Sequence, residues 1–173
     1  MFRKLSTDQL NRLTIYQYRQ AGKHPVAIVL DNVRSMNNVG SIFRSADCFG
    51  IEKVYLCGIT ATPPHRDIHK TALGAEESME WAYYPDTAEL CRELKHQGYT
   101  LIAVEQVEGS TPLGEIKLEK DKKYAVIFGN EIDGVSDGAL NYCDACIEIP
   151  QYGTKHSFNV SVCAGIVLWE LLH

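Results

Sequence analysis

Apolar runs alternate along the chain with segments whose apolar residues recur at helical spacing. Continuous apolar runs are typical of strands buried on both faces of a sheet. The predicted strands are VAIVLD (26–31), KVYLCG (53–58), WAYY (81–84), YTLIAVEQ (99–106), YAVIFGNE (124–131) and CIEIP (146–150). The predicted helices lie at about 6–20, 37–50, near 69, 86–96, near 136–142 and 157–172. Such alternation predicts an α/β fold, with a mostly parallel sheet flanked by helices.

Ligands of parallel sheets bind where the strands end. The loops after Asp31, Gln106, Phe128 and Ile149 are therefore the places to look for chemistry. Residues 59–80, which include two prolines, read as polar and irregular except for a short helical stretch.

Length and composition narrow the class of protein. The chain has 173 residues, of which 45% are apolar and 23% charged, as in one globular domain. No apolar run is long enough to cross a bilayer, and residues 1–24 lack the apolar core of a signal peptide, so we expect a cytoplasmic protein. The six cysteines are scattered through apolar patterns and read as reduced, mostly buried thiols.

Charge is distributed unevenly along the chain. The net charge is −5, yet residues 1–24 hold five basic residues against one aspartate. We therefore divide the chain into a basic N-terminal helical arm (1–24) and a single domain (25–173). The arm has two open interpretations, a nucleic-acid contact or a solvated helix face.

Arg44 occupies an unusual position in NNVGSIFRSADCFG (37–50). In a helix the apolar residues of this segment share one side, and Arg44 lies on another. None of its helical neighbours is bulky: Gly40, Ser41, Asp47 and Cys48. The pattern leaves two interpretations, an ordinary surface charge or a cation with free space for a docked group.

Two further loops carry polar residues at strand ends. Gly129 and Gly134 allow close backbone approach or positive φ, and Glu131 lies between them. Ser157 and Asn159 stand at the mouth of the last helix, where Ser157 is a candidate cap and an amide near the buried side needs partners. A plain strand-to-helix turn remains the alternative for the glycine loop, because neither GxGxxG nor GxxxxGK[ST] is present.

Metal sites are poorly supported by the pattern. Cys143 and Cys146 form a CxxC without a second pair, and His65 and His69 lack a third ligand. Arg66 and Lys70 make the histidine segment a small basic patch that suits phosphate contacts better. No metal is expected.

Taken in order, three segments resemble the motifs of the SpoU/TrmH-type RNA 2′-O-methyltransferases of the SPOUT superfamily. They are NNVGSIFRSADCFG (37–50), YAVIFGNEIDGVS (124–136) and IEIPQYGTKHSFNVSVCAGIVLWEL (147–171). HKTALGAEESMEW (69–81) resembles the segment that lies between the first two motifs. The resemblance covers roughly residues 25–173, and three motifs in order are a far more specific signal than one glycine loop.

The resemblance implies a SPOUT α/β fold with a C-terminal trefoil knot, a feature that pattern reasoning alone would not propose. It implies S-adenosyl-L-methionine as cofactor, RNA as substrate and a homodimer with the active site at the subunit interface. Residues with family roles in catalysis fall on Asn38, Arg44, Glu131, Ser157 and Asn159. Residues implied to line the cofactor fall on Val104, Glu105, Gly129, Ile149 and Phe158. For RNA contacts we single out Arg34, Arg66 and Lys70.

Departures from the family pattern bear on the substrate. The third motif is often SLNVS and here reads SFNVS, so Phe158 replaces a leucine beside the cofactor. Residues 1–173 show no counterpart of the RNA-binding domain of larger members, which favours tRNA over ribosomal RNA and makes the basic arm the visible substitute. Two other functions stay open: an RNA-binding protein without catalysis on the same fold, and a nucleotide-dependent oxidoreductase on a Rossmann-type sheet.

Overall fold

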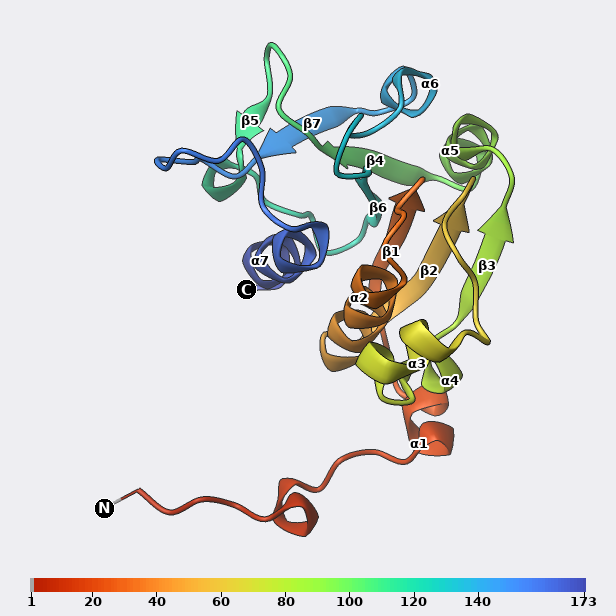
Figure 1. Cartoon of the computed structure of the whole chain (residues 1–173), viewed down its shortest axis with the longest axis vertical. Helices are drawn as coiled ribbons and strands as arrows, with labels where there is room; N and C mark the ends of the chain where they lie inside the picture. Colours follow the sequence, from red (N-terminus) through yellow and green to blue (C-terminus); the bar gives the residue numbers. More distant parts are fainter. Residues whose placement is uncertain (1) are drawn as a thin grey trace.

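A seven-stranded, fully parallel sheet forms the centre of the molecule in the computed structural model, which describes residues 2–173 (Figure 1). The strand order is β3-β2-β1-β6-β4-β7-β5. The strands are β1 (His24–Asp31), β2 (Ile51–Cys57), β3 (Trp81–Tyr84), β4 (Tyr99–Val104), β5 (Thr111–Pro112), β6 (Lys123–Phe128) and β7 (Ala145–Glu148). Every neighbouring pair is parallel, as the alternating pattern predicts. The two-residue β5 is too short to leave a sequence signal.

Helices cover both faces of this sheet. They are η1 (Thr7–Leu10), α1 (Ile15–Gln20), α2 (Met36–Cys48), α3 (Arg66–Ala72), α4 (Ala75–Ser78), α5 (Thr87–His96), η2 (Leu113–Glu115), α6 (Asp137–Leu140) and α7 (Val160–Leu172). Alternate residues of β1 enter different cores: Ile28 packs with α2 and α7, whereas Val29 packs with α5 and α6. Burial on both faces explains why the central strands read as continuous apolar runs.

The predicted N-terminal helix over 6–20 is wrong as a single element. The chain forms η1, passes through a left-handed Asn11 (φ 47°) and restarts at α1. Gln9 and Gln17 close capping boxes at Ser6 and Thr14, so two local N-termini compete with one continuous helix. The second piece packs on the domain, where α1 contacts α4 and the Arg19 guanidinium donates to the Glu77 carbonyl at 2.5 Å.

Other boundaries also differ from prediction, among them the strand predicted over 124–131, which ends at Phe128, and the strand predicted over 99–106, which ends at Val104. The last helix begins at Val160 with Asn159 as its cap, three residues later than predicted. The Asn159 side-chain oxygen accepts hydrogen bonds from the backbone N–H of Ser161 (3.0 Å) and of Val162 (3.4 Å), so the amide takes the place predicted for Ser157. Within 59–80, α3 and α4 form a helical pair where one short stretch was expected.

The cysteines are all free, as expected. Their predicted burial holds for Cys57 and Cys91 and fails for Cys48, which is exposed at the end of α2. No helix within residues 2–173 combines the length and the apolar character needed to cross a membrane.

Candidate active site

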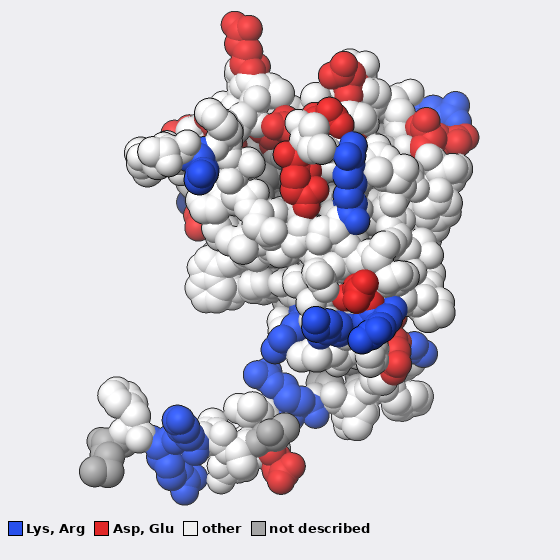
Figure 2. Space-filling model, in the orientation of Figure 1, with Lys and Arg blue, Asp and Glu red and all other residues white. Residues whose placement is uncertain are grey.

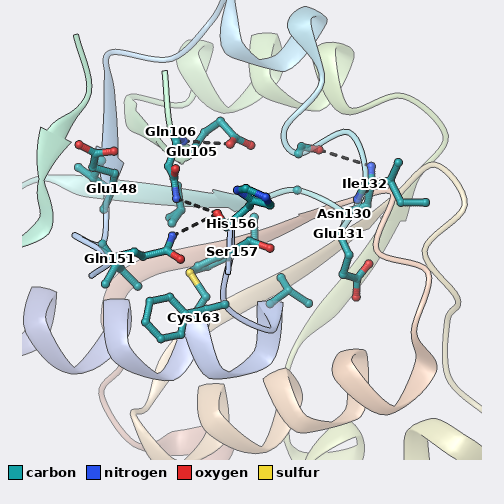
Figure 3. Close-up of a pocket in the computed structure, with 18 residues that line it drawn as sticks. Glu105, Gln106, Asn130, Glu131, Ile132, Glu148, Gln151, His156, Ser157 and Cys163 are labelled. Atoms are coloured by element: carbon teal, nitrogen blue, oxygen red, sulfur yellow. Dashed lines mark hydrogen bonds between the residues drawn. The ribbon is translucent and has the colours of Figure 1, made fainter. Parts of the chain in front are cut away.

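A cavity opens where β4, β6 and β7 end, at the carboxyl edge of the sheet (Figure 3). Its walls come from the loops that follow these strands and from the start of α7. Two of the four loops selected from the sequence, those after Phe128 and Ile149, therefore meet here, together with Gln106 at the start of a third. The loop after Asp31 reaches the site from beside the cavity, through residues of α2.

The five residues implied to hold the cofactor all line this one cavity: Val104, Glu105, Gly129, Ile149 and Phe158. They come from four separate stretches of the chain. The strand register explains part of this arrangement, because Val104 pairs with Phe128 and with Ile147 across neighbouring strands. Adjacent parallel strands thus deliver their following residues to the same edge.

The loop from Gly129 to Ser136 is held tightly by backbone contacts. A side chain at Gly129 would collide with the backbone of Gly134, which itself has φ +67°, so both glycines are required where they stand. The Glu105 carboxylate accepts from the Val135 N–H at 2.9 Å, and the Asp31 carboxylate accepts from the Ser136 N–H at 2.7 Å. Two carboxylates thereby fix consecutive amides of the loop that carries Glu131.

Asp31 is a residue that sequence reasoning missed. Its side chain is fully buried at the end of β1 and also accepts a hydrogen bond from the Thr87 hydroxyl at 2.5 Å. The available signal was a carboxylate at the end of an apolar run, because a buried carboxylate needs several donors.

The loop between β7 and α7 closes the other side of the cavity. The side-chain amides of Gln106 and Gln151 both donate to the His156 carbonyl, at 3.2 and 3.4 Å (Figure 3). Ser157 follows directly and lines the cavity. Neither glutamine was singled out from the sequence, since a polar residue after a strand carries no specific signal by itself.

Three residues of the three motifs form one hydrogen-bonded chain. The Asn38 amide donates to the Glu131 carboxylate at 2.7 Å, and the Asn159 amide donates to the Asn38 side-chain oxygen at 3.1 Å. Asn38 lies in the first turn of α2, Glu131 in the glycine loop and Asn159 at the cap of α7. The expectation that Asn159 lies near the buried side is wrong: Asn159 is exposed, yet its amide both donates to Asn38 and accepts from the first turn of α7.

Arg44 is not among the residues that line the cavity. It lies six residues after Asn38 on α2, about 9 Å along the helix axis, and it is exposed. No hydrogen bond or ion pair is formed by its guanidinium within residues 2–173.

The small residues around Arg44 are explained by helix packing. Gly40 is buried because α3 packs against it, and a side chain there would collide with Thr71 and with the Ile68 carbonyl. The Asp47 carboxylate accepts from the Ser78 hydroxyl at 2.5 Å. These small neighbours serve the packing of α2 against α3 and α4.

The three cations proposed for RNA contacts are exposed but lie in two places. Arg34 follows β1 and stands 3.8 Å from the Asp133 carboxylate, whereas Arg66 and Lys70 lie one turn apart on α3. Figure 2 shows basic side chains along the N-terminal arm and over the neighbouring helices, while acidic side chains prevail around β7 and α6.

The two histidines of this segment act separately. The His65 side chain caps α3 by accepting from the Asp67 N–H at 3.1 Å, so the expected meeting of His65 and His69 on one helix face is wrong. His69 instead lies 2.5 Å from the Glu76 carboxylate.

The charged side chains that line the cavity are negative. Glu105, Glu131 and Glu148 line it, and none of its described lining residues is Lys or Arg. Burial, reinforced by the charge of Glu105, raises the pKa of the Cys163 thiol in the wall to about 11. That thiol is therefore neutral at physiological pH and is no nucleophile.

Residues 25–169 match the model of the SpoU rRNA Methylase family. This range contains the cavity at the carboxyl edge of the parallel sheet and the hydrogen-bonded chain Asn159–Asn38–Glu131 beside it. The chain belongs to the SpoU rRNA Methylase family.

Two characterised relatives are similar over most of this chain. The 23S rRNA (guanosine-2′-O-)-methyltransferase of Neisseria meningitidis is 32% identical over 146 residues, which are 84% of this chain and 57% of the relative. The tRNA (guanosine(18)-2′-O)-methyltransferase of Thermus thermophilus is 32% identical over 145 residues, which are 84% of this chain and 73% of the relative. The chain thus spans little more than half of the first relative's length.

A solved structure has the same architecture. The AdoMet-bound rRNA methyltransferase of Sinorhizobium meliloti superposes with a TM-score of 0.79 at 27% identity. The match covers 88% of this chain and 58% of that protein.

Proposed function

We propose that this protein transfers a methyl group from S-adenosyl-L-methionine to a ribose 2′-hydroxyl of RNA. The observation that carries the proposal is the hydrogen-bonded chain from Asn159 through Asn38 to Glu131, which joins all three motifs beside one cavity. Both characterised relatives are named as RNA guanosine 2′-O-methyltransferases, which supports the reaction class.

The side chains that line the cavity fit the proposed cofactor. Apolar Val104, Ile149 and Phe158 offer surface for a purine ring, and the carboxylates of the lining favour a molecule with a net positive charge. S-adenosylmethionine carries a sulfonium and an ammonium group, and when bound it supplies an electrophilic methyl group. A dinucleotide needs donors for its phosphates, so the acidic lining speaks against the oxidoreductase alternative.

The proposed chemistry needs a base or a stabilising charge at the ribose, because a 2′-hydroxyl is a poor nucleophile. Arg44 stabilises the developing alkoxide electrostatically, since a guanidinium keeps its charge and is poorly suited to act as a base. The hydroxyl proton passes to a neighbouring phosphate of the RNA. Glu131 and Asn38 hold the start of α2 against the glycine loop, and Ser157 and Asn159 position the ribose at the mouth of α7. Much of the rate comes from aligning hydroxyl and methyl.

A homodimer explains why Arg44 stands outside the cavity of its own chain. The face of α7 that is turned to solvent carries apolar side chains at one helical spacing, Val162, Ile166 and Trp169, with exposed fractions of 52%, 36% and 57%. Such a stripe on a helix that also packs on α2 favours a second copy at this face. The active site is then completed at the subunit interface, where Arg44 serves it.

Two finer proposals accompany the reaction. We propose a trefoil knot in the C-terminal half, supported by a strand order in which β6 inserts between β1 and β4 and β7 inserts between β4 and β5. We also propose tRNA as the favoured substrate, with Arg34, Arg66 and Lys70 on the RNA path, since phosphate contacts position an RNA without reading its sequence.

The test is methyl transfer from labelled S-adenosylmethionine to total tRNA and, separately, to rRNA. Label in one pool supports the reaction and selects the substrate class. Cofactor binding without label in either pool would favour the RNA-binding alternative. Stoichiometric binding of NAD in place of S-adenosylmethionine would refute the proposed cofactor.

A further inference from the structure

Residues 2–14, here called the outer arm segment, project from the domain without covering their apolar side chains (Figure 1). Phe2 is fully exposed, and Leu5, Leu10 and Leu13 are 57%, 42% and 56% exposed. None of the side chains described in this segment belongs to either hydrophobic core. The hydrogen bonds described for residues 2–14 all stay within residues 6–18.

The local conformation of the outer arm segment is nevertheless specified by its own side chains. The Ser6 N–H donates to the Gln9 side chain at 3.0 Å, and the Thr14 N–H donates to the Gln17 side chain at 2.9 Å. Two such reciprocal caps within one short stretch hold the backbone in a defined shape. A segment with a defined backbone conformation and three exposed leucines is typical of a segment that docks on another surface.

The chemistry of the outer arm segment favours a protein surface. Leucine side chains neither stack on bases as aromatic rings do nor contact phosphates, so an RNA would leave them uncovered. Arg3, Lys4 and Arg12 give the segment a positive charge, whereas the domain beyond residue 24 carries the excess of acidic residues. Apolar and cationic groups together therefore fit an acidic protein surface of this same chain.

The outer arm segment is directed away from its own domain. In Figure 1 it leaves the domain at α1, below α3 and α4, and runs outward to the N-terminus. Its side chains are therefore placed to contact another molecule, and a second copy presents the same acidic excess beyond residue 24.

We infer that the outer arm segment docks on the domain of a second copy of this chain and strengthens the homodimer. This inference rests on the dimer of the proposed function and adds a second, exchanged contact to it. Leu5, Leu10 and Leu13 supply the apolar part of the contact, and Arg3, Lys4 and Arg12 supply its electrostatic part.

The experiment compares two matched triple variants of the full chain, L5S/L10S/L13S and R3S/K4S/R12S, with the wild type. Sedimentation equilibrium measures the dimer dissociation constant, and fluorescence anisotropy measures affinity for total tRNA at protein concentrations above that constant. We expect the leucine variant to raise the dissociation constant at least tenfold with unchanged tRNA affinity. The charge variant raises it several-fold at low salt and has no effect at 0.5 M salt.

Each other outcome overturns the inference. A wild-type dimer whose dissociation constant is unchanged in the leucine variant overturns the arm contact and leaves the proposed dimer intact. A monomeric wild type overturns both. Loss of tRNA affinity in the charge variant, with an unchanged dimer, identifies the arm as an RNA contact. A lower melting temperature of the leucine variant with an unchanged dimer identifies docking on its own domain.

Discussion

The side chain of Asn159 donates a hydrogen bond of 3.1 Å to the side chain of Asn38, although the two asparagines are 121 positions apart. Asn38 passes the connection on to the Glu131 carboxylate at 2.7 Å. The side-chain amide of Asn38 therefore connects the N-cap of α7 and the glycine loop to the first turn of α2. Because Asn38 both accepts and donates, no apolar or purely accepting side chain can replace it.

Asn38→Asp tests this chain. The new carboxylate would face Glu131 at hydrogen-bond distance, and like charges so close cost on the order of 1–4 kcal/mol near a surface. We expect methyl-transfer turnover to fall by about tenfold or more. The matched control is Asn37→Asp, the preceding residue of the same turn, whose side chain forms no described hydrogen bond. Equal turnover in the two variants would show that the hydrogen bonds of Asn38 do not contribute to methyl transfer.

Gly40→Ala tests the packing explanation for the small residues around Arg44. An added methyl group collides with the Ile68 carbonyl and Thr71, so we expect the free energy of unfolding to fall by about 1–3 kcal/mol in chemical denaturation. Gly114→Ala is the control, because its added carbon meets open space. A Gly40→Ala protein as stable as the wild type would show that α3 is not held against α2 in this way.

The Cys163 thiol provides a pH-dependent readout of the cavity. Burial raises its pKa to about 11 from an ordinary value near 9, so the reactive thiolate is about 100-fold scarcer at pH 8 than in an ordinary thiol. Iodoacetamide should modify Cys163 slowly at pH 8, faster as the pH approaches 11, and at the ordinary rate in urea. Mass spectrometry of Cys163 peptides follows the rates. Rapid modification of the folded protein at pH 8 would contradict a raised pKa for this half-buried thiol in the cavity wall.

Ile166→Asp tests the dimer face. A charge in the apolar stripe of α7 becomes buried and unpaired when a second copy covers it, so we expect the dimer dissociation constant to rise at least about 100-fold. Tyr142→Asp places the same charge at an equally exposed apolar residue outside α7. Sedimentation that gives the same mass for both variants would exclude α7 as the interface.

Periodicity predicted the architecture because the central strands are buried on both faces and the helices between them are amphipathic. The strands β1, β4 and β6 lie where the apolar runs lie. Asp86, the first residue of the helix predicted over 86–96, is the N-cap of α5 and accepts from the Glu89 N–H at 2.8 Å. The N-terminal helix failed because the local caps at Ser6 and Thr14 outweigh a weak helical pattern, and the part before Thr14 adds no described residue to either hydrophobic core.

The sequence predicted which residues line the cavity wall at Val104, Glu105, Gly129, Ile149 and Phe158, but not how the motifs are connected. The motif resemblance named Asn38, Glu131 and Asn159, but their mutual hydrogen bonds depend on strand order, which no local pattern encodes. The hydrogen bonds accepted by Asp31 were missed for the same reason, since the donors Thr87 and Ser136 come from distant stretches of the chain. The role of Arg44 stays a prediction, and the small residue Gly40 beside it is explained by the packing of α3 against α2. The roles assigned to these residues stay predictions.

The most direct measurement is alkaline hydrolysis of RNA labelled by this protein, with Arg44→Ala beside the wild type. A ribose methylated at its 2′-oxygen lacks the free hydroxyl that alkaline cleavage requires, so its label stays in alkali-resistant dinucleotides. We predict all wild-type label in dinucleotides, and in Arg44→Ala no label despite unchanged S-adenosylmethionine binding. Label released as mononucleotides would mean base methylation, and a fully active Arg44→Ala protein would contradict the mechanism.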